Sequence, residues 1–213
     1  MKESKSYPIV LLHGIHRTAN SMRSFQRAFD QRGFLVINLS YPSMKHSIEE
    51  SANSIAVRLA PLGEQEFDMV VHSLGGLVTR AMLARHPRLR VRRLVMLGTP
   101  NRGSELATKL QKSPIYRVLF GKPHSAIAHE SEFIKNLPPP RCEFGIIAGG
   151  FGKKFGMVPW VRGDNDGLVA VESAKLDGAK DFILLRLDHR RLLHSRKAIH
   201  QTLHFLEHGR FEK

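Results

Sequence analysis

The sequence predicts an α/β fold, in which helices flank a mostly parallel central sheet of about six strands. Short apolar runs rich in Val, Ile, Leu and Phe recur with little polar alternation, which is typical of strands buried on both faces of a parallel sheet. Helical patterns separate these runs, and strands that alternate with helices build such a sheet. A chain of 213 residues is most simply one domain, so we expect a single domain over residues 1–213.

Each predicted strand is short and dominated by apolar side chains. In chain order the six strands are Ile9–His13, Phe34–Leu39, Phe67–His72, Arg93–Gly98, Glu143–Ala148 and Phe182–Leu187. Three helices are also expected. Ser47–Leu62 repeats apolar residues with the helical period, Leu74–Arg85 follows the third strand, and Ser195–Glu207 is followed by Gly209, which is placed to end it.

Residues 103–137 interrupt this alternation, because no clear strand falls between Gly103 and Leu137. So long a stretch without a sheet element is unusual for a connection inside a compact domain. We therefore expect a short lid or cap insertion over 103–137, with an irregular surface excursion as the alternative.

The composition excludes several classes of protein. No apolar run reaches the roughly 20 residues that a membrane-spanning helix needs. No zinc-finger spacing or aromatic RNA-binding box is present, so no specific nucleic-acid partner is expected. The single cysteine, Cys142, and the lack of a signal-peptide pattern indicate a cytoplasmic protein. The net charge of +14 favours either an ordinary solvated basic surface or an anionic partner, such as an anionic membrane surface or an acidic protein.

Polar residues that could carry chemistry follow several of the predicted strands. Ligands of open α/β sheets bind beyond the carboxyl ends of the strands, so these residues should meet at one edge. They include a serine, then aspartates, then a histidine, in that chain order: Ser73 after the third strand, the loop 163–167 after the fifth, and Asp188-His189 after the sixth.

Ser73 lies in the stretch "VVHSLGG", residues 70–76, where a buried strand runs into a helix. Such a strand–turn–helix junction is typical of a nucleophile elbow, whose usual pattern is G-x-S-x-G. Val71 stands where the pattern has its first glycine, and Gly75 stands at the second. The alternative interpretation is that Ser73 only caps the helix that follows.

The chain resembles the α/β-hydrolases of the lipase and esterase type, in the compact form of small bacterial lipase-like proteins. Five pieces carry the resemblance, and they extend over almost the whole chain in the family's order. They are "VLLHGIHRTANSM", "VVHSLGG", "LGTPNRGSELA", "GDNDGLVAVESA" and "LDHRRLLHSRKAIHQTLHFLEHGRF".

The resemblance implies a catalytic triad of Ser73 as nucleophile, His189 as base and Asp166 as the acid that orients it. His194 is a competing base, and Asp164 is a competing acid in the same loop as Asp166. The elbow geometry assigns one backbone N–H of the oxyanion hole to Leu74, and the family's "HG-x" pattern assigns the other to Ile15, with His13 ordering that loop.

The function implied is a serine hydrolase that cleaves carboxylic esters through an acyl-enzyme, with a small-molecule or lipid ester as substrate and no metal or cofactor. A thioesterase or acyltransferase would use the same residues, and a catalytically silent scaffold that binds an anionic partner is the alternative from another class. Residues 101–163 hold ten Lys and Arg against four Asp and Glu, so we hypothesise that the entrance favours anionic or membrane-surface substrates. The sequence leaves the oligomeric state open.

Overall fold

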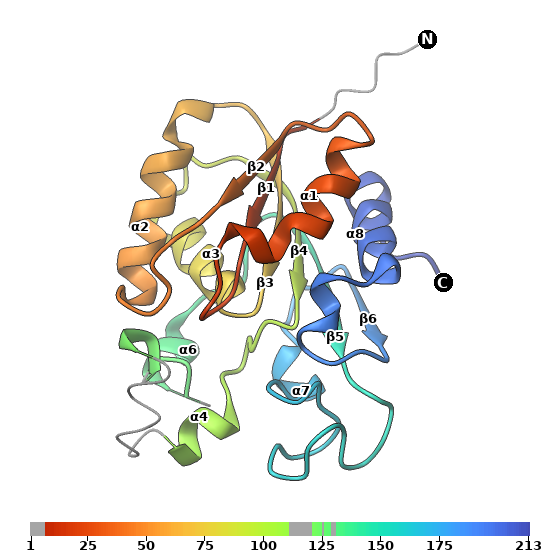
Figure 1. The fold of residues 1–213 in the computed structure, drawn as a ribbon. Helices are drawn as coiled ribbons and strands as arrows, with labels where there is room; N and C mark the ends of the chain where they lie inside the picture. The colour runs from red at the N-terminus through yellow and green to blue at the C-terminus, as the bar shows by residue number, and fades with distance from the viewer. Residues whose placement is uncertain (1–6, 111–120, 125, 129–130) are drawn as a thin grey trace.

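A computed structural model of the chain describes residues 7–110, 121–124, 126–128 and 131–213. Its centre is a six-stranded, entirely parallel sheet in the order β2-β1-β3-β4-β5-β6 (Figure 1). The strands are β1 (Ile9–Leu12), β2 (Val36–Leu39), β3 (Phe67–His72), β4 (Val91–Leu97), β5 (Glu143–Gly149) and β6 (Asp181–Leu185). All six predicted strands are confirmed, each end lying within two residues of the prediction.

Four longer helices cover the two faces of the sheet: α1 (Arg23–Asp30), α2 (Ile48–Leu59), α3 (Leu74–Arg85) and α8 (Arg196–His208). Shorter helical segments follow the strands or connect the longer helices: α4 (Glu105–Leu110), α6 (Glu132–Asn136), α7 (Val171–Ala174), and the 3-10 turns Ala19–Met22, Ala60–Leu62, Lys122–His124 and Arg191–Leu193. The sequence did not predict α1, because only Phe25 and Phe29 of its eight residues are buried.

Local chemistry sets the ends of the predicted helices. The Ser47 side chain accepts the backbone N–H of Glu50, and the Glu50 carboxylate accepts the N–H of Ser47, so a capping box begins α2. The Ser195 side chain accepts the backbone N–H of Ala198 and so caps α8, and Gly209, at φ 70°, ends α8 in the left-handed conformation that glycine adopts without strain.

Two apolar cores lie on opposite faces of the sheet, because successive strand residues point to opposite sides. On β3, Met69 and Val71 pack in the core that includes α2 and α3, whereas Val70 packs with α1 and α8. Figure 1 shows α2 and α3 on one side of the sheet and α1 and α8 on the other. Both faces of the central strands are therefore buried, which explains their continuous apolar runs.

The described residues between 103 and 137 form the helical segments α4 and α6 and one 3-10 turn, and a single bridge joins Ser104 to Ala128. No strand occurs in these described parts. Positions 111–120, 125 and 129–130 of the predicted lid lie outside the described residues, so the lid stays a prediction. Nowhere in the described chain does a helix combine the length and apolar character needed to cross a bilayer.

Candidate active site

Ser73 stands at the turn between β3 and α3 with a backbone at φ 53° and ψ −123°. Positive φ is rare for residues with a side chain, and among the described non-glycine residues only His16 and Ser73 have it. Ser73 occupies the N-cap position of α3, but its side chain makes no capping hydrogen bond. Helix capping therefore does not explain the serine, and the backbone has the strained geometry that functional turns retain.

Two glycines allow the Ser73 turn to pack closely against the end of β1. A Cβ on Gly14 would lie 2.8 Å from the Cβ of Ser73, and one on Gly75 would lie 2.7 Å from the carbonyl oxygen of His13. Val71, the departure from the glycine pattern, is fully buried in regular register with Leu12 and Met96. Its side chain joins the core beside α2 and α3, so the strand accommodates it without opening the turn.

Asp166 and His189 form a buried hydrogen-bonded pair. The Nδ1 of His189 lies 2.7 Å from Oδ2 of Asp166, and the backbone N–H of His189 donates to the Asp166 carbonyl at 2.9 Å. The other carboxylate oxygen accepts the backbone N–H groups of Leu168 and Val169. These bonds fix both side chains, so that Asp166 can orient a histidine and stabilise it once protonated.

The competing acid and base make other contacts. Asp164 accepts the backbone N–H groups of Phe151 and Gly152, at 2.8 and 2.7 Å, and so holds its own loop together. The Nδ1 of His194 lies 3.0 Å from Oγ of Ser24. The structure thus pairs His189 with Asp166 and gives Asp164 and His194 structural partners.

His72 connects the Ser73 turn to the His189 loop. Its Nε2 donates to the His189 carbonyl oxygen at 3.1 Å, and the two rings lie 4.6 Å apart between centroids. Burial lowers the pKa of His72 well below the ordinary value of histidine, and the nearby His189 adds to this effect. Gly98, at φ 54°, passes so close that a Cβ there would lie 3.1 Å from the Nδ1 of His189. The residue before Ser73 therefore contacts the proposed base directly.

The two residues expected to form an oxyanion hole directly follow Ser73 and Gly14 in the sequence, and Gly14 packs against Ser73. Leu74 is the first residue of α3, and a backbone N–H at that position has no partner within its helix. Ile15 follows Gly14 in the loop after β1, which packs on Ser73. His13 orders this loop: its Nε2 accepts the N–H of Tyr41 at 3.2 Å, and its ring stacks on the Tyr41 ring.

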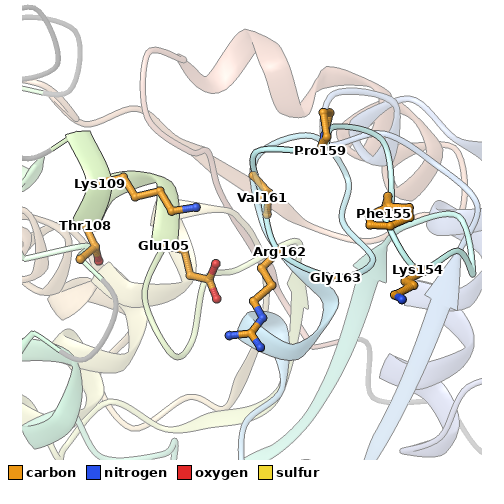
Figure 2. Close-up of a pocket in the computed structure, with 9 residues that line it drawn as sticks. All are labelled: Glu105, Thr108, Lys109, Lys154, Phe155, Pro159, Val161, Arg162 and Gly163. Atoms are coloured by element: carbon orange, nitrogen blue, oxygen red, sulfur yellow. The ribbon is translucent and has the colours of Figure 1, made fainter.

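A pocket of about 780 Å³ opens between α4 and the segment that connects β5 to α7 (Figure 2). Glu105 and Lys109 line it from α4, while Phe155 and Arg162 line it from the connecting segment. Neither Ser73 nor His189 is among its lining residues. Within the part of the chain that the structure describes, no group of three or more His, Cys, Asp or Glu side chains is arranged to hold a metal ion.

A family model described as "Domain of unknown function (DUF7379)" matches residues 4–120, more than half of the chain. The chain belongs to the DUF7379 family. No curated protein sequence matches this DUF7379 member.

Several solved structures of bacterial proteins share its fold. The mature lipase BlEst2 of Bacillus licheniformis superposes with a TM-score of 0.76 at 19% identity, over 96% of this chain and 92% of that one. The lin2722 gene product of Listeria innocua superposes with a TM-score of 0.67 at 17% identity, over 98% of this chain and 96% of that one. A thermophilic esterase of Thermogutta terrifontis superposes with a TM-score of 0.62 at 13% identity, over 95% of this chain and 90% of that one. This DUF7379 chain therefore has the α/β-hydrolase fold, as the sequence predicted.

Arg80 and Asn165 of the DUF7379 chain are buried polar residues that were not predicted. Arg80, inside α3, donates to the carbonyl oxygens of Asn101, Leu137 and Pro138, and burial lowers its pKa to about 10. The available signal in the sequence was a charged residue in the middle of a helix whose neighbouring residues are mostly apolar. Asn165 is fully buried between the two loop aspartates, and nothing in the local sequence distinguishes it from a turn residue.

Proposed function

We propose that the chain is a serine hydrolase that cleaves carboxylic esters through an acyl-enzyme. The observation that carries the proposal is the buried 2.7 Å pair of Asp166 and His189, in which His189 also contacts His72, the residue before Ser73. The strained backbone of Ser73 supports it, because such conformations persist mainly where function requires them. The shared fold agrees with ester hydrolysis without establishing it.

In the proposed reaction, Oγ of Ser73 attacks the ester carbonyl carbon while neutral His189 accepts the hydroxyl proton. The oxyanion that forms accepts hydrogen bonds from the N–H groups of Ile15 and Leu74. His189 then returns its proton to the departing alkoxide, which leaves as the alcohol. Water, deprotonated by His189, attacks the acyl-enzyme, and the proton passes back to Ser73 as the carboxylic acid departs.

Other acyl transfers would use the same residues. A thioesterase would release a thiol instead of an alcohol, and an acyltransferase would replace water with another acceptor. The acyl chain length is likewise open, and a series of p-nitrophenyl esters of increasing chain length would measure it. An anionic partner, favoured by the net charge of +14, also stays a prediction.

The first test is labelling with a fluorophosphonate probe, which reacts with an activated serine. We expect the wild type and a Ser24→Ala control to be labelled, and Ser73→Ala to be unlabelled although folded by circular dichroism. Ser24 is a suitable control because it contacts His194, the competing base. Absence of labelling in folded wild-type protein would instead favour the silent scaffold, and labelling that persists in Ser73→Ala would move the nucleophile elsewhere.

A further inference from the structure

The segment of residues 153–168, here called the rim, connects β5 to α7 and exposes several large apolar side chains. Phe155 is 66% exposed, Trp160 57%, Met157 52% and Leu168 43%. A single exposed apolar residue needs no explanation, but several in one short segment mark an interaction site. Among the described residues, half of the eight large apolar side chains that are exposed lie in this segment.

A buried side chain holds the rim in shape. The amide of Asn165 is fully buried, and its Nδ2 lies within 3.2 Å of the carbonyl oxygens of Phe155, Val158 and Val161. Its Oδ1 accepts the backbone N–H groups of Val158 and Gly167. The Asn165 amide therefore fixes the backbone of the rim, and in this conformation the four apolar side chains are exposed.

The outward charge of the rim is positive. Lys153, Lys154 and Arg162 are exposed, and the Lys154 ammonium lies 5.7 Å from the centroid of the Phe155 ring. The two acidic residues of the rim turn inward, since Asp164 binds backbone N–H groups and Asp166 binds His189. Exposed aromatic and basic side chains thus occur together on the same segment.

The rim also borders the pocket and the candidate active site. Phe155 and Arg162 line the pocket opposite α4 (Figure 2), and the Nζ of Lys109 on α4 donates to the Trp160 carbonyl oxygen at 3.3 Å. The same segment contains Asp166, so a surface that binds the rim would lie next to the proposed triad.

We propose that the rim binds an anionic lipid surface, with Phe155, Met157 and Trp160 entering the headgroup region and the basic residues contacting acidic headgroups. Tryptophan and other amphipathic aromatics favour the membrane–water interface, and Lys and Arg are attracted to acidic lipids. A folded protein partner would need a matching face of about 800 Å² on each side, whereas a lipid surface needs no matching outline. The binding proposal does not depend on the proposed hydrolysis.

Trp160 is the only tryptophan of the chain, so its fluorescence reports on the rim alone. We expect the emission maximum of the wild-type protein to shift to the blue with vesicles of equal parts phosphatidylcholine and phosphatidylserine. Vesicles of phosphatidylcholine alone should give a much smaller shift, and added salt should weaken the response because it screens the charges. The Ser73→Ala variant should bind like the wild type, which separates this result from the outcome of the labelling test.

Matched double variants show which positive charges contribute to binding of the anionic vesicles. Each basic residue at an anionic membrane surface contributes about fivefold in affinity, so Lys153→Gln/Lys154→Gln should bind about 25-fold more weakly. Arg85→Gln/Arg88→Gln removes the same charge at the opposite edge of the sheet, where α3 leads to β4, and should bind like the wild type. Phe155→Ser/Met157→Ser should also weaken binding while leaving the Trp160 reporter in place.

Three results would overturn the proposal. One is an unchanged Trp160 emission maximum with the anionic vesicles at low salt. Another is an equal loss of binding in the two charge variants, which would assign the attraction to the net charge and not to the rim. The third is a blue shift that grows with protein concentration in the absence of vesicles, which would mean that a second copy of the chain covers the rim.

Discussion

Ser73 adopts a backbone conformation that costs about 1–3 kcal/mol for a residue with a side chain. Its neighbours maintain it: the Ser73 N–H donates to the Leu97 carbonyl oxygen at 2.9 Å, and its carbonyl oxygen accepts the N–H of Gly76. Val71 does not relieve or add to this strain, because its side chain lies in the core on the α2 and α3 face. The glycine at the usual position two residues before the serine is therefore dispensable in this turn.

The assignment of Asp166 as the acid of the triad can be tested with Asp→Asn variants, which replace one carboxylate oxygen by an amide nitrogen. Asp166→Asn would present an amide to His189 and favour the wrong tautomer, so kcat for p-nitrophenyl acetate should fall about 10⁴-fold. Asp164→Asn is the matched control two residues away. We expect its kcat to stay within about tenfold of the wild type because the Asp164 carboxylate accepts the backbone N–H groups of Phe151 and Gly152 and makes no described bond to His189. Similar losses in both variants would contradict the assignment of Asp166.

The helix α3 has two roles, since its first turn positions Ser73 and its middle fixes the segments above the sheet. Arg80 is 2% exposed and reaches the loop after β4 at Asn101 and the chain after α6 at Leu137 and Pro138. No carboxylate within the described residues forms an ion pair with it, so its guanidinium is satisfied by carbonyl oxygens. Arg80 thereby ties the predicted lid region to the helix that bears the nucleophile.

If Arg80 connects these segments, replacing it should lower the free energy of unfolding. Arg80→Met leaves several buried carbonyl oxygens without donors, and we expect the free energy of unfolding to fall by about 3 kcal/mol. Arg85→Met, on the exposed end of the same helix, should change it by less than about 0.5 kcal/mol. Urea denaturation followed by circular dichroism measures both variants, and equal stability of the two would show that the Arg80 contacts contribute nothing.

The molecule as a whole carries a net charge of +14 and also buries two neutral histidines near its candidate site. Burial lowers the pKa of both His13 and His72 below the ordinary value of 6.5. The unfolded chain therefore binds protons at a higher pH than the folded chain does. Stability contributed by these neutral histidines is present above pH 6.5 and is lost as the pH falls below it.

We accordingly expect the free energy of unfolding to decrease between pH 7 and pH 5, by at most about 1.4 kcal/mol per pH unit for each histidine. His72→Gln should make this dependence shallower, whereas His208→Gln on the exposed end of α8 should leave it unchanged. Urea titrations at several pH values provide the measurement. A wild-type stability that is constant over this range would contradict the expectation.

Much of the fold could be read from the sequence, because strands buried on both faces must be continuously apolar and the helices between them carry periodic apolar residues or clear caps. The same logic brought Ser73, the 163–167 loop and His189 to one sheet edge, since parallel strands place their carboxyl ends together. Helix α1 was not predicted because two buried phenylalanines one turn apart are too few to show a helical period.

The sequence by itself determined the parallel sheet, the position of each strand to within two residues and the set of polar residues that follow the strands. Only the tertiary structure decided which of them pair. Asp164 and Asp166 are two residues apart, and the path of the backbone turns one towards Gly152 and the other towards His189. The packing of Val71 and the carbonyl oxygens around Arg80 likewise join segments that are distant in the sequence, which no local pattern encodes. The buried amide of Asn165 depends on how the backbone of residues 155–167 folds around it.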